Sequence, residues 1–283
     1  MAMGSAHVPN GISLLISDVD GTLVTKAKVL TDRTREAVRR LRNAGIAFAL
    51  TSSRPPRGLR WLIEELGIAT PVVGFNGGMI VTPDLAPIEQ HVLPSEIARR
   101  AVELMSRDGA RIWVFSRNEW FLQDAAGPYV GLEERTVKFP PTVVSDFGAA
   151  LDSAAKIVGV SDDFASLARC ETETSRALGD DASVARSQPY YLDVTHRSAN
   201  KGVAVATLAR LLGVPRQCIA TIGDGANDVA MFKESGLSIA MGNAEPEVKN
   251  AAKVVTGSNE ADGFAEAVEQ HVLHAPAGTG SRS

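Results

Sequence analysis

The chain has 283 residues, of which 45% are hydrophobic and 22% charged, so it is long enough to bury a full core and to form two domains. Its net charge of −4, without a long run of lysine or arginine, argues against binding to nucleic acid or to an anionic membrane. No apolar stretch approaches the roughly 18 residues of a spanning helix, and residues 1–10 lack a signal-peptide core. We therefore expect a cytoplasmic protein, either a monomer or a small homo-oligomer.

The first part of the chain alternates predicted strands and helices. Ile12 to Ile16 is an apolar run typical of a buried parallel strand. A short irregular flap, Val24 to Leu30, leads to a helix that Thr31 caps. The alternation continues with a strand at 46–50, a helix at 56–66 and a strand at 71–75. This order indicates an α/β fold with a doubly wound parallel sheet.

The rhythm changes after residue 78, where short strands and hairpins begin to dominate. The elements predicted there are strands at 79–81, 88–92 and 156–160, hairpins at 111–123 and 183–194, and helices at 95–107 and 164–178. They indicate an inserted α+β cap domain with an open antiparallel sheet over residues 84–189. The core is then discontinuous, covering 11–83 and 190–274, and residues 1–10 and 275–283 are expected to be flexible termini.

From residue 200 the parallel alternation resumes. The predicted elements are helices at 201–212, 229–235, 246–252 and 263–272, and strands at 218–222, 237–240 and 254–255. The two cysteines, Cys170 and Cys218, are far apart among apolar neighbours, so we expect two buried free thiols. An inserted domain that returns to the same sheet commonly acts as a lid over its active edge.

Two carboxylates follow the first strand directly. Asp18 and Asp20 are spaced i, i+2, so both side chains leave the strand end on the same side and lie close together. Such a pair is costly unless a positive group lies between them. Gly21 allows the backbone to turn so that its amide can point at an anion. The pattern predicts a site for a divalent metal and a phosphate, although two acids before a glycine also occur in ordinary turns.

A second acidic loop comes after the predicted strand at 218–222. Asp224, between two glycines, and Asp228, at a helix start, can face the same end of the sheet as Asp18 and Asp20. Mg²⁺ fits four such acids, because it takes oxygen ligands and is completed by a substrate phosphate. Lys201 could offset the charge of a nucleophilic carboxylate and of a phosphate, but its position is also typical of an exposed lysine at a helix start.

Taken together, these segments resemble the motifs of haloacid dehalogenase superfamily phosphatases, specifically the Cof-type, class IIB branch with a C2 cap. The resemblance covers nearly the whole chain and rests on Asp18 to Leu23, Ser52-Ser53-Arg54-Pro55, Lys201-Gly202, Gly223 to Asp228 and Ala240 to Ala244. The second motif has Ser-Ser-Arg where Thr-Gly-Arg is commoner, but Ser52 keeps the hydroxyl. Asn76-Gly77-Gly78 resembles the Asn-Gly-Ala junction of this branch.

The resemblance implies a role for each matched residue. Asp18 would attack phosphorus and form an aspartyl-phosphate, and Asp20 would act as general acid and then as general base. Mg²⁺ would be held by Asp18 and Asp224, by the backbone carbonyl of Asp20, and by Asp228 directly or through water. The residues expected at the phosphate or substrate are Ser52, Lys201, Gly21, Asn227, Arg54 and Asn76, of which Arg54 and Asn76 are equally compatible with structural roles.

The sequence therefore predicts a Mg²⁺-dependent phosphatase that hydrolyses a small soluble phosphomonoester, a sugar phosphate or a related metabolite. Two alternatives remain open at this stage. A phosphomutase on the same fold would return the phosphoryl group to its substrate through a bisphosphate. A non-catalytic protein could use the same scaffold to bind a phosphorylated metabolite.

Overall fold

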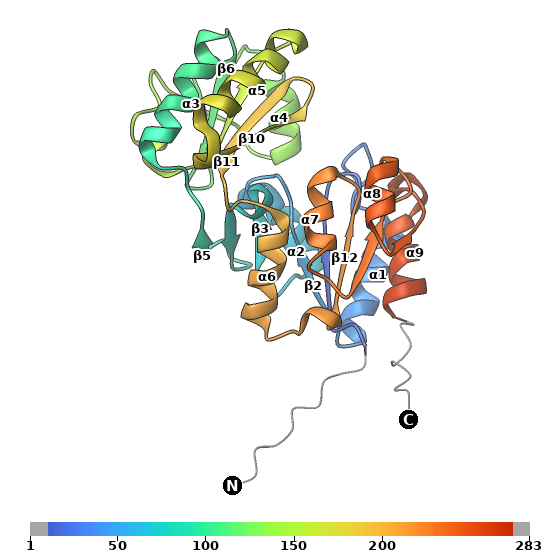
Figure 1. Cartoon of the computed structure of the whole chain (residues 1–283). Coiled ribbons are helices and arrows are strands. Elements are labelled where there is room, and N and C mark those ends of the chain that lie inside the picture. Colours follow the sequence, from blue (N-terminus) through green and yellow to red (C-terminus); the bar gives the residue numbers. More distant parts are fainter. Residues whose placement is uncertain (1–10, 274–283) are drawn as a thin grey trace. The chain divides into compact units, whose positions relative to one another are not determined.

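The computed structural model describes residues 11–273, and the termini predicted to be flexible, residues 1–10 and 275–283, lie outside this range. Within it the chain forms two compact units (Figure 1). Unit 1 comprises residues 11–51, 66–70 and 201–273, and unit 2 comprises residues 52–65 and 71–200. The predicted cap domain, residues 84–189, falls wholly within unit 2, and its precise limits stay a prediction.

Unit 1 contains a five-stranded sheet in which every neighbouring pair is parallel, in the order β14-β13-β12-β1-β2. Its strands are β1 (Leu14–Ser17), β2 (Ala47–Leu50), β12 (Ile219–Gly223), β13 (Leu237–Ala240) and β14 (Val254–Val255). The first strand of the chain lies between β12 and β2, so all four of its residues are buried. This burial explains why the strand reads as a continuous apolar run rather than an alternating one.

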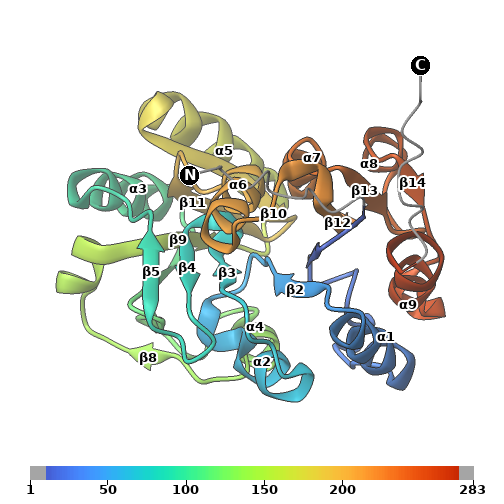
Figure 2. The same cartoon turned by 90° about the horizontal axis from the view of Figure 1, so that it is seen from below.

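Helices cover both faces of the parallel sheet, as the predicted doubly wound fold requires. Figure 2 shows α1 and α9 together on one face and α6 and α7 together on the other. The helices of unit 1 are α1 (Asp32–Asn43), α6 (Lys201–Leu212), α7 (Val229–Phe232), α8 (Pro246–Ala251) and α9 (Gly263–Ala267), and α9 continues as a π-helical turn over Val268–Val272.

Unit 2 contains two further sheets, one of three strands and one of six. The three-stranded sheet has the order β3-β4-β5 and the six-stranded sheet the order β10-β11-β9-β6-β7-β8. The strands are β3 (Val72–Gly74), β4 (Met79–Val81), β5 (Pro87–Gln90), β6 (Arg111–Ser116), β7 (Glu119–Leu122), β8 (Thr142–Val143), β9 (Ala154–Val160), β10 (Ala182–Gln188) and β11 (Tyr191–His196). The larger sheet is antiparallel except for the short β7–β8 pair.

The sequence-based expectation for residues 71–75, a third strand of the parallel sheet, is wrong in its pairing. The strand forms as β3, but it pairs antiparallel with β4. Three consecutive residues, Phe75, Asn76 and Gly77, have positive φ angles of 53°, 56° and 105° and reverse the chain immediately after β3. The next strand therefore folds back beside β3, whereas a parallel partner would need a longer crossover.

The six-stranded sheet buries its main apolar core under two long helices. Side chains of α3 (Ser95–Arg107) and α5 (Phe164–Leu178) pack against this sheet. Figure 1 shows the two helices on the same face of it. Two shorter helices complete the unit, α2 (Arg60–Leu66), of which the last residue belongs to unit 1, and α4 (Val130–Val137). The predicted open sheet with helices on one face is thus observed, and both cysteines are buried free thiols as expected.

The N-terminus of α1 shows how the local sequence fixes a helix end. The Thr31 hydroxyl accepts a hydrogen bond from the amide of Thr34 at 3.1 Å, as expected of the predicted N-cap. The same hydroxyl donates to Asp262 Oδ1 at 2.7 Å, which ties α1 to the segment before α9. One side chain therefore serves both a helix end and a long-range contact.

We expect Thr31→Ala to lower the free energy of unfolding by about 1 kcal/mol or somewhat more, because an N-cap and a second hydrogen bond are lost together. Urea denaturation followed by circular dichroism measures this change. Thr31→Ser is the matched control, since it keeps the oxygen. Equal stabilities of the alanine and serine variants would contradict the assignment.

Candidate active site

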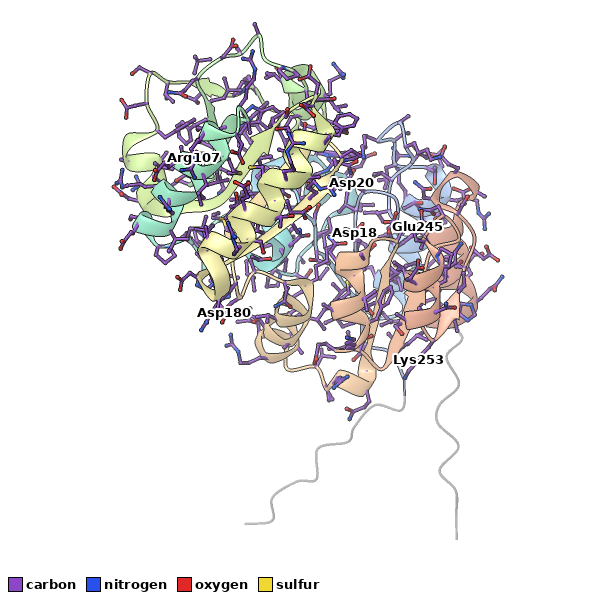
Figure 3. The ribbon with its side chains drawn as sticks, turned by 45° about the horizontal axis from the view of Figure 1, so that its top comes forward. Asp18, Asp20, Arg107, Asp180, Glu245 and Lys253 are labelled. Carbon is purple, nitrogen blue, oxygen red and sulfur yellow. The ribbon has the colours of Figure 1, made fainter. Side chains whose placement is uncertain are left out.

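The register of the parallel sheet brings two acidic loops to the same level. Ser17 at the end of β1 is aligned with Ile222 of β12, and the amide of Asp18 donates to the Ile222 carbonyl at 2.9 Å. Asp18 therefore leaves β1 at the level where Gly223 and Asp224 follow Ile222. Figure 3 shows Asp18 and Asp20 at this end of the sheet and Lys253, which precedes β14, at the opposite end. Carboxyl ends of parallel strands are where α/β proteins commonly bind ligands.

Lys201 joins the two loops through its ammonium group. Lys201 Nζ lies 2.6 Å from Asp18 Oδ1 and 2.5 Å from Asp228 Oδ1. All three residues are buried, with exposed fractions of 1% for Lys201, 6% for Asp18 and 0% for Asp228. The structure thus brings together three of the predicted site residues and excludes the alternative of a solvent-exposed lysine at the start of α6.

Glycines allow the second acidic loop to close tightly on Asp228. Asp228 Oδ2 accepts hydrogen bonds from the amides of Asp224 and Gly225, both at 2.9 Å. A Cβ on Gly223 would lie 2.3 Å from Asp228 Oδ2, so a larger residue there would displace the carboxylate. Both oxygens of Asp228 are therefore engaged, one with the lysine and the other with the loop backbone.

Asp224 is held in place by neighbours from two other segments. Thr22 Oγ1 donates to Asp224 Oδ1 at 3.0 Å, and Asn243 Nδ2 lies 3.1 Å from Asp224 Oδ2 and 2.9 Å from the carbonyl of Gly21. Gly21 has a φ of +82°, and a Cβ there would lie 2.1 Å from Asp224 Oδ2. Only glycine satisfies both the positive φ and this close approach. Thr22 and Asn243 lie in two of the sequence motifs, but the sequence analysis assigned no role to either residue.

Burial of these carboxyl groups changes their protonation. Burial raises the pKa of Asp18 to about 8, against the attraction of Lys201 and with help from the charges of Asp228 and Asp224. Burial, followed by the charge of Asp228, also raises the pKa of Asp224 to about 6. Burial lowers the pKa of Lys201, but Asp18 and Asp228 outweigh it, so the net pKa of Lys201 rises above its usual value. The lysine stays charged, and negative charge remains in excess.

The donor set of this site fits a divalent cation. Asp18, Asp224 and Asp228 each offer a carboxylate oxygen, and these oxygens all lie within 4.8 Å of one another. They are hard oxygen ligands with no histidine or cysteine among them, as Mg²⁺ prefers. A cation here would also relieve the repulsion that raises the pKa values of Asp18 and Asp224.

Asp20 has a partner that the sequence analysis did not identify. Lys28 Nζ lies 2.5 Å from Asp20 Oδ1, and the exposed fractions of the two side chains are 33% and 27%. Lys28 belongs to the segment predicted as an irregular flap, where nothing distinguishes it from Lys26 in the sequence. The sequence offers only the spacing of eight residues between Lys28 and Asp20. This spacing identifies the pair only when the turn between the two residues is known.

The remaining predicted residues are distributed over both units. Asn227 is exposed in the turn before α7, and Gly21 lies against Asp224. Ser52, Arg54 and Asn76 belong to unit 2, where the Ser52 carbonyl accepts from the Asn76 amide at 2.8 Å and Ser52 Oγ accepts from the Arg54 amide at 3.1 Å.

The Arg54 side chain is buried within unit 2. One guanidinium nitrogen donates to the carbonyl of Thr136 in α4 at 2.8 Å, and the whole residue is 3% exposed. This contact gives Arg54 a structural role in unit 2, in line with one of the two roles left open by its sequence. Whether it also contacts substrate stays a prediction.

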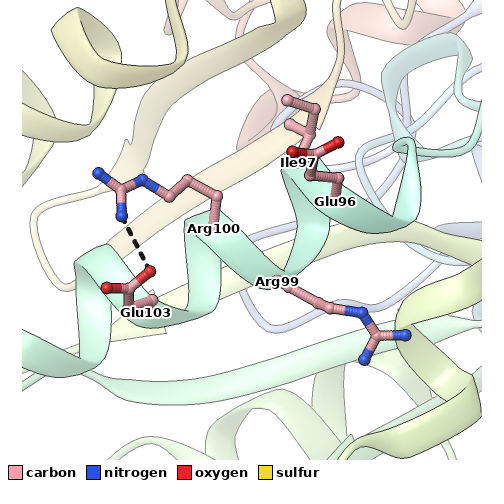
Figure 4. A pocket seen from close by; sticks show the side chains of 5 residues that line it. All are labelled: Glu96, Ile97, Arg99, Arg100 and Glu103. Atoms are coloured by element: carbon pink, nitrogen blue, oxygen red, sulfur yellow. Dashed lines mark hydrogen bonds and ion pairs between the residues drawn. The ribbon is translucent and has the colours of Figure 1, made fainter.

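A surface hollow of about 380 Å³ lies along α3 and contains none of the predicted site residues. Arg100 and Glu103 form an ion pair of 2.9 Å within it (Figure 4), and the residues that line it are Glu96, Ile97, Arg99, Arg100 and Glu103.

Among residues 11–273, no helix is both long enough and apolar enough to cross a membrane.

The fold and the site together define a class of hydrolases. Its features are a parallel α/β core, an aspartate pair after the first strand, a second acidic loop and a buried lysine. A family model described as haloacid dehalogenase-like hydrolase matches residues 15–268. The chain therefore belongs to the haloacid dehalogenase-like hydrolase family, and the Cof-type resemblance read from its motifs is confirmed. It is an enzyme, a phosphoric monoester hydrolase of this superfamily.

Similar proteins match over most of their length. A Haemophilus influenzae protein named "Putative phosphatase" is 30% identical over 257 residues, 90% of this chain and 97% of that protein. The 5-amino-6-(5-phospho-D-ribitylamino)uracil phosphatase YcsE of Bacillus subtilis is 26% identical over 93% of this chain and 96% of its own. The crystal structure of a haloacid dehalogenase-like hydrolase from Bacteroides thetaiotaomicron, 32% identical, has a TM-score of 0.84 and covers 91% of this chain and 98% of that chain.

The raised pKa of Asp18 predicts a pH-dependent stability of the metal-free protein. Between about pH 4 and pH 8 the folded chain retains a proton on Asp18 that the unfolded chain has released, so stability falls as the pH rises. Asp18→Asn removes this penalty. The variant should therefore be more stable than the wild type at pH 8.5, by on the order of a few kcal/mol, and similar to it near pH 4.

Urea unfolding in EDTA at the two pH values measures the difference. Asp180→Asn, at an exposed position, is the control and should show no such dependence on pH. An Asp18→Asn effect of the same size at pH 4 and pH 8.5 would contradict the explanation by protonation.

Proposed function

We propose that the protein is a Mg²⁺-dependent phosphatase that hydrolyses a small soluble phosphomonoester through an aspartyl-phosphate on Asp18. The observation that carries this proposal is the buried contact of Lys201 with both Asp18 and Asp228 at the carboxyl end of β1. Once ionised, a buried carboxylate next to a fixed ammonium is set up for nucleophilic attack on a charged phosphoryl group, where positioning and charge neutralisation supply most of the catalysis.

The proposed reaction uses the carboxyl groups of Asp18 and Asp20 in the roles that the sequence motif implies. An oxygen of Asp18 attacks phosphorus in line, the bond to the ester oxygen breaks, and Asp20 gives its proton to the departing alkoxide. Asp20 then takes a proton from water, which attacks the aspartyl-phosphate, releases inorganic phosphate and restores Asp18. Lys201 remains charged throughout, because its contacts with Asp18 and Asp228 hold its pKa above the usual value.

Asp18 and Asp224 would hold the cation with their carboxylates, together with the backbone carbonyl of Asp20. Asp228 already uses both oxygens, one for Lys201 and one for the loop amides, which favours contact with the cation through water. When bound, Mg²⁺ neutralises charge on the phosphoryl oxygens and orients them. Its requirement by this chain is a proposal, supported by the oxygen-only donor set.

The phosphate would be bound by Lys201, by the backbone at Gly21 and Asn227, and by the hydroxyl of Ser52. Ser52 accepts a hydrogen bond from the Arg54 amide, so its own hydroxyl proton is directed elsewhere and suits a phosphoryl oxygen. Arg54 and Asn76 are the further candidates for substrate contact. All of these assignments rest on the motifs of the sequence and on local geometry.

For the substrate we propose a sugar phosphate or a related small metabolite. The name of the Bacillus subtilis relative specifies a phosphorylated ribityl compound, which belongs to this chemical range. The predicted cap domain in unit 2 would exclude macromolecular substrates and select among small ones. A cytoplasmic location and a monomeric or small homo-oligomeric state stay predictions from the sequence.

A phosphate-release screen over phosphorylated metabolites tests the proposal. We expect turnover with Mg²⁺, loss of turnover in EDTA, and recovery when Mg²⁺ is added back. Asp18→Asn should fold but lose activity by several orders of magnitude, because the nucleophile is missing. Near-normal turnover of this variant would reject Asp18 as nucleophile, and a requirement for a bisphosphate activator would identify a phosphomutase instead.

Asp20→Asn should depend on the leaving group. An alkyl phosphate needs a proton donor for its alkoxide, whereas an aryl phosphate leaves as a stable phenolate, so the loss of kcat should be about tenfold or more greater for the alkyl ester. Steady-state kinetics with a matched pair of esters measures this ratio. Equal losses for the two esters would show that Asp20 is not the acid.

A further inference from the structure

The ion pair between Lys28 and Asp20 lies at the edge of the acidic site but outside its buried centre. Lys201 is almost completely buried and already contacts two carboxylates, whereas the side chain of Lys28 is one-third exposed. With all four carboxyl groups ionised, two ammonium groups leave an excess of two negative charges, which one divalent cation would neutralise. Lys28 is therefore part of the charge balance that a Mg²⁺ site here would require.

A tight turn carries Lys28 to this position. The amide of Lys28 donates to the Thr25 carbonyl at 2.9 Å, and the amide of Thr25 donates to the Val29 carbonyl at 3.0 Å. The base of the turn is anchored, since Asn259 Nδ2 donates to the Val24 carbonyl at 2.9 Å and the Lys26 amide donates to Glu260 Oε1 at 2.6 Å. The direction in which the Lys28 side chain leaves the turn is thereby fixed.

The backbone of Lys28 is unfavourable for lysine. Its φ of +61° is left-handed, a conformation that costs a residue with a Cβ on the order of 1 kcal/mol and that glycine adopts freely. A turn selected for stability alone would have glycine or asparagine at this position. Strain that persists next to a site is a reason to look for a function of the side chain, and here the side chain ends on Asp20.

We propose that Lys28 is a positioning residue, which through its contact with Oδ1 holds the Asp20 carboxyl group where this group can exchange a proton with the leaving group. The proposal rests on the proposed function, because it requires Asp20 to be the acid and base of the reaction. The alternative is that Lys28 and Asp20 form only a partly exposed salt bridge, which contributes between zero and about 1 kcal/mol to stability and nothing to catalysis. The two differ in what removal of the ammonium does to kcat.

Lys28→Gln and Lys26→Gln form a matched pair, because both lysines lie in the same turn and only Lys28 contacts Asp20 through its side chain. We expect Lys28→Gln to lower kcat for an alkyl phosphate about tenfold, with a smaller loss for an aryl phosphate and little change in KM. Lys26→Gln should retain wild-type kinetics, and Lys28→Arg should recover part of the loss. A kcat of Lys28→Gln within about twofold of Lys26→Gln overturns the proposal.

Lys28→Gly separates a catalytic loss from a folding defect. Glycine relieves the left-handed backbone, so the melting temperature should stay at or above that of the wild type while kcat falls as in Lys28→Gln. In an Asp20→Asn background the Lys28→Gln change should have no further effect on kcat, because the residue it positions is already disabled. A full additional tenfold loss in that background would assign Lys28 a role independent of Asp20 and reject the proposal.

The same experiments separate a failure of the proposed function from a failure of the proposed role of Lys28. Wild-type protein that releases no phosphate from any ester with Mg²⁺ rejects the proposed function, and the role of Lys28 falls with it. Active wild-type protein with an unaffected Lys28→Gln variant rejects the role of Lys28 alone.

Discussion

The ammonium group of Lys201 is the contact on which the rest of the site depends. It lies between Asp18 and Asp228, which come from opposite ends of the chain, and without it two buried carboxylates would face each other in a medium where an unpaired charge is costly. The lysine begins α6, so the helix fixes the charge in space. The acidic loops can therefore lie close together in the folded chain, in an arrangement that could hold a cation.

Much of the fold could be predicted from the sequence, because its elements carry their own signals. The ranges of α3, α5 and α6 match the predicted helices, and Thr31 caps α1 as its side chain suggests. The pairing of β3 could not be predicted, since its apolar run fits a parallel or an antiparallel partner equally well. Helix α4 was missed because Tyr129 and Lys138, which bound it, both have left-handed backbones that these residue types rarely adopt.

The candidate site, like the fold, could be predicted only in part. Asp18, Asp224 and Asp228 could be grouped from sequence because the ends of neighbouring parallel strands meet at one edge, and the motif order gave Lys201. The contact of Asn243 with Gly21 and Asp224 could not be foreseen, since it depends on how a third loop approaches the first two. The partner of Asp20 was equally hidden, because a left-handed residue in a turn decides which of two lysines reaches it.

The position of β1 has a consequence for how the protein is made. Its neighbour on one side, β2, is synthesised soon afterwards, but β12 begins only at Ile219, about 200 residues later. A ribosome adds roughly 5–20 residues per second, so for on the order of ten seconds or more the emerging chain carries an apolar strand with one edge open. Unit 2 is completed in that interval, and it can fold while the nascent β1 is exposed to chaperones. Asp18, at the end of β1, acquires its surroundings last, when nearly the whole polypeptide has left the exit tunnel.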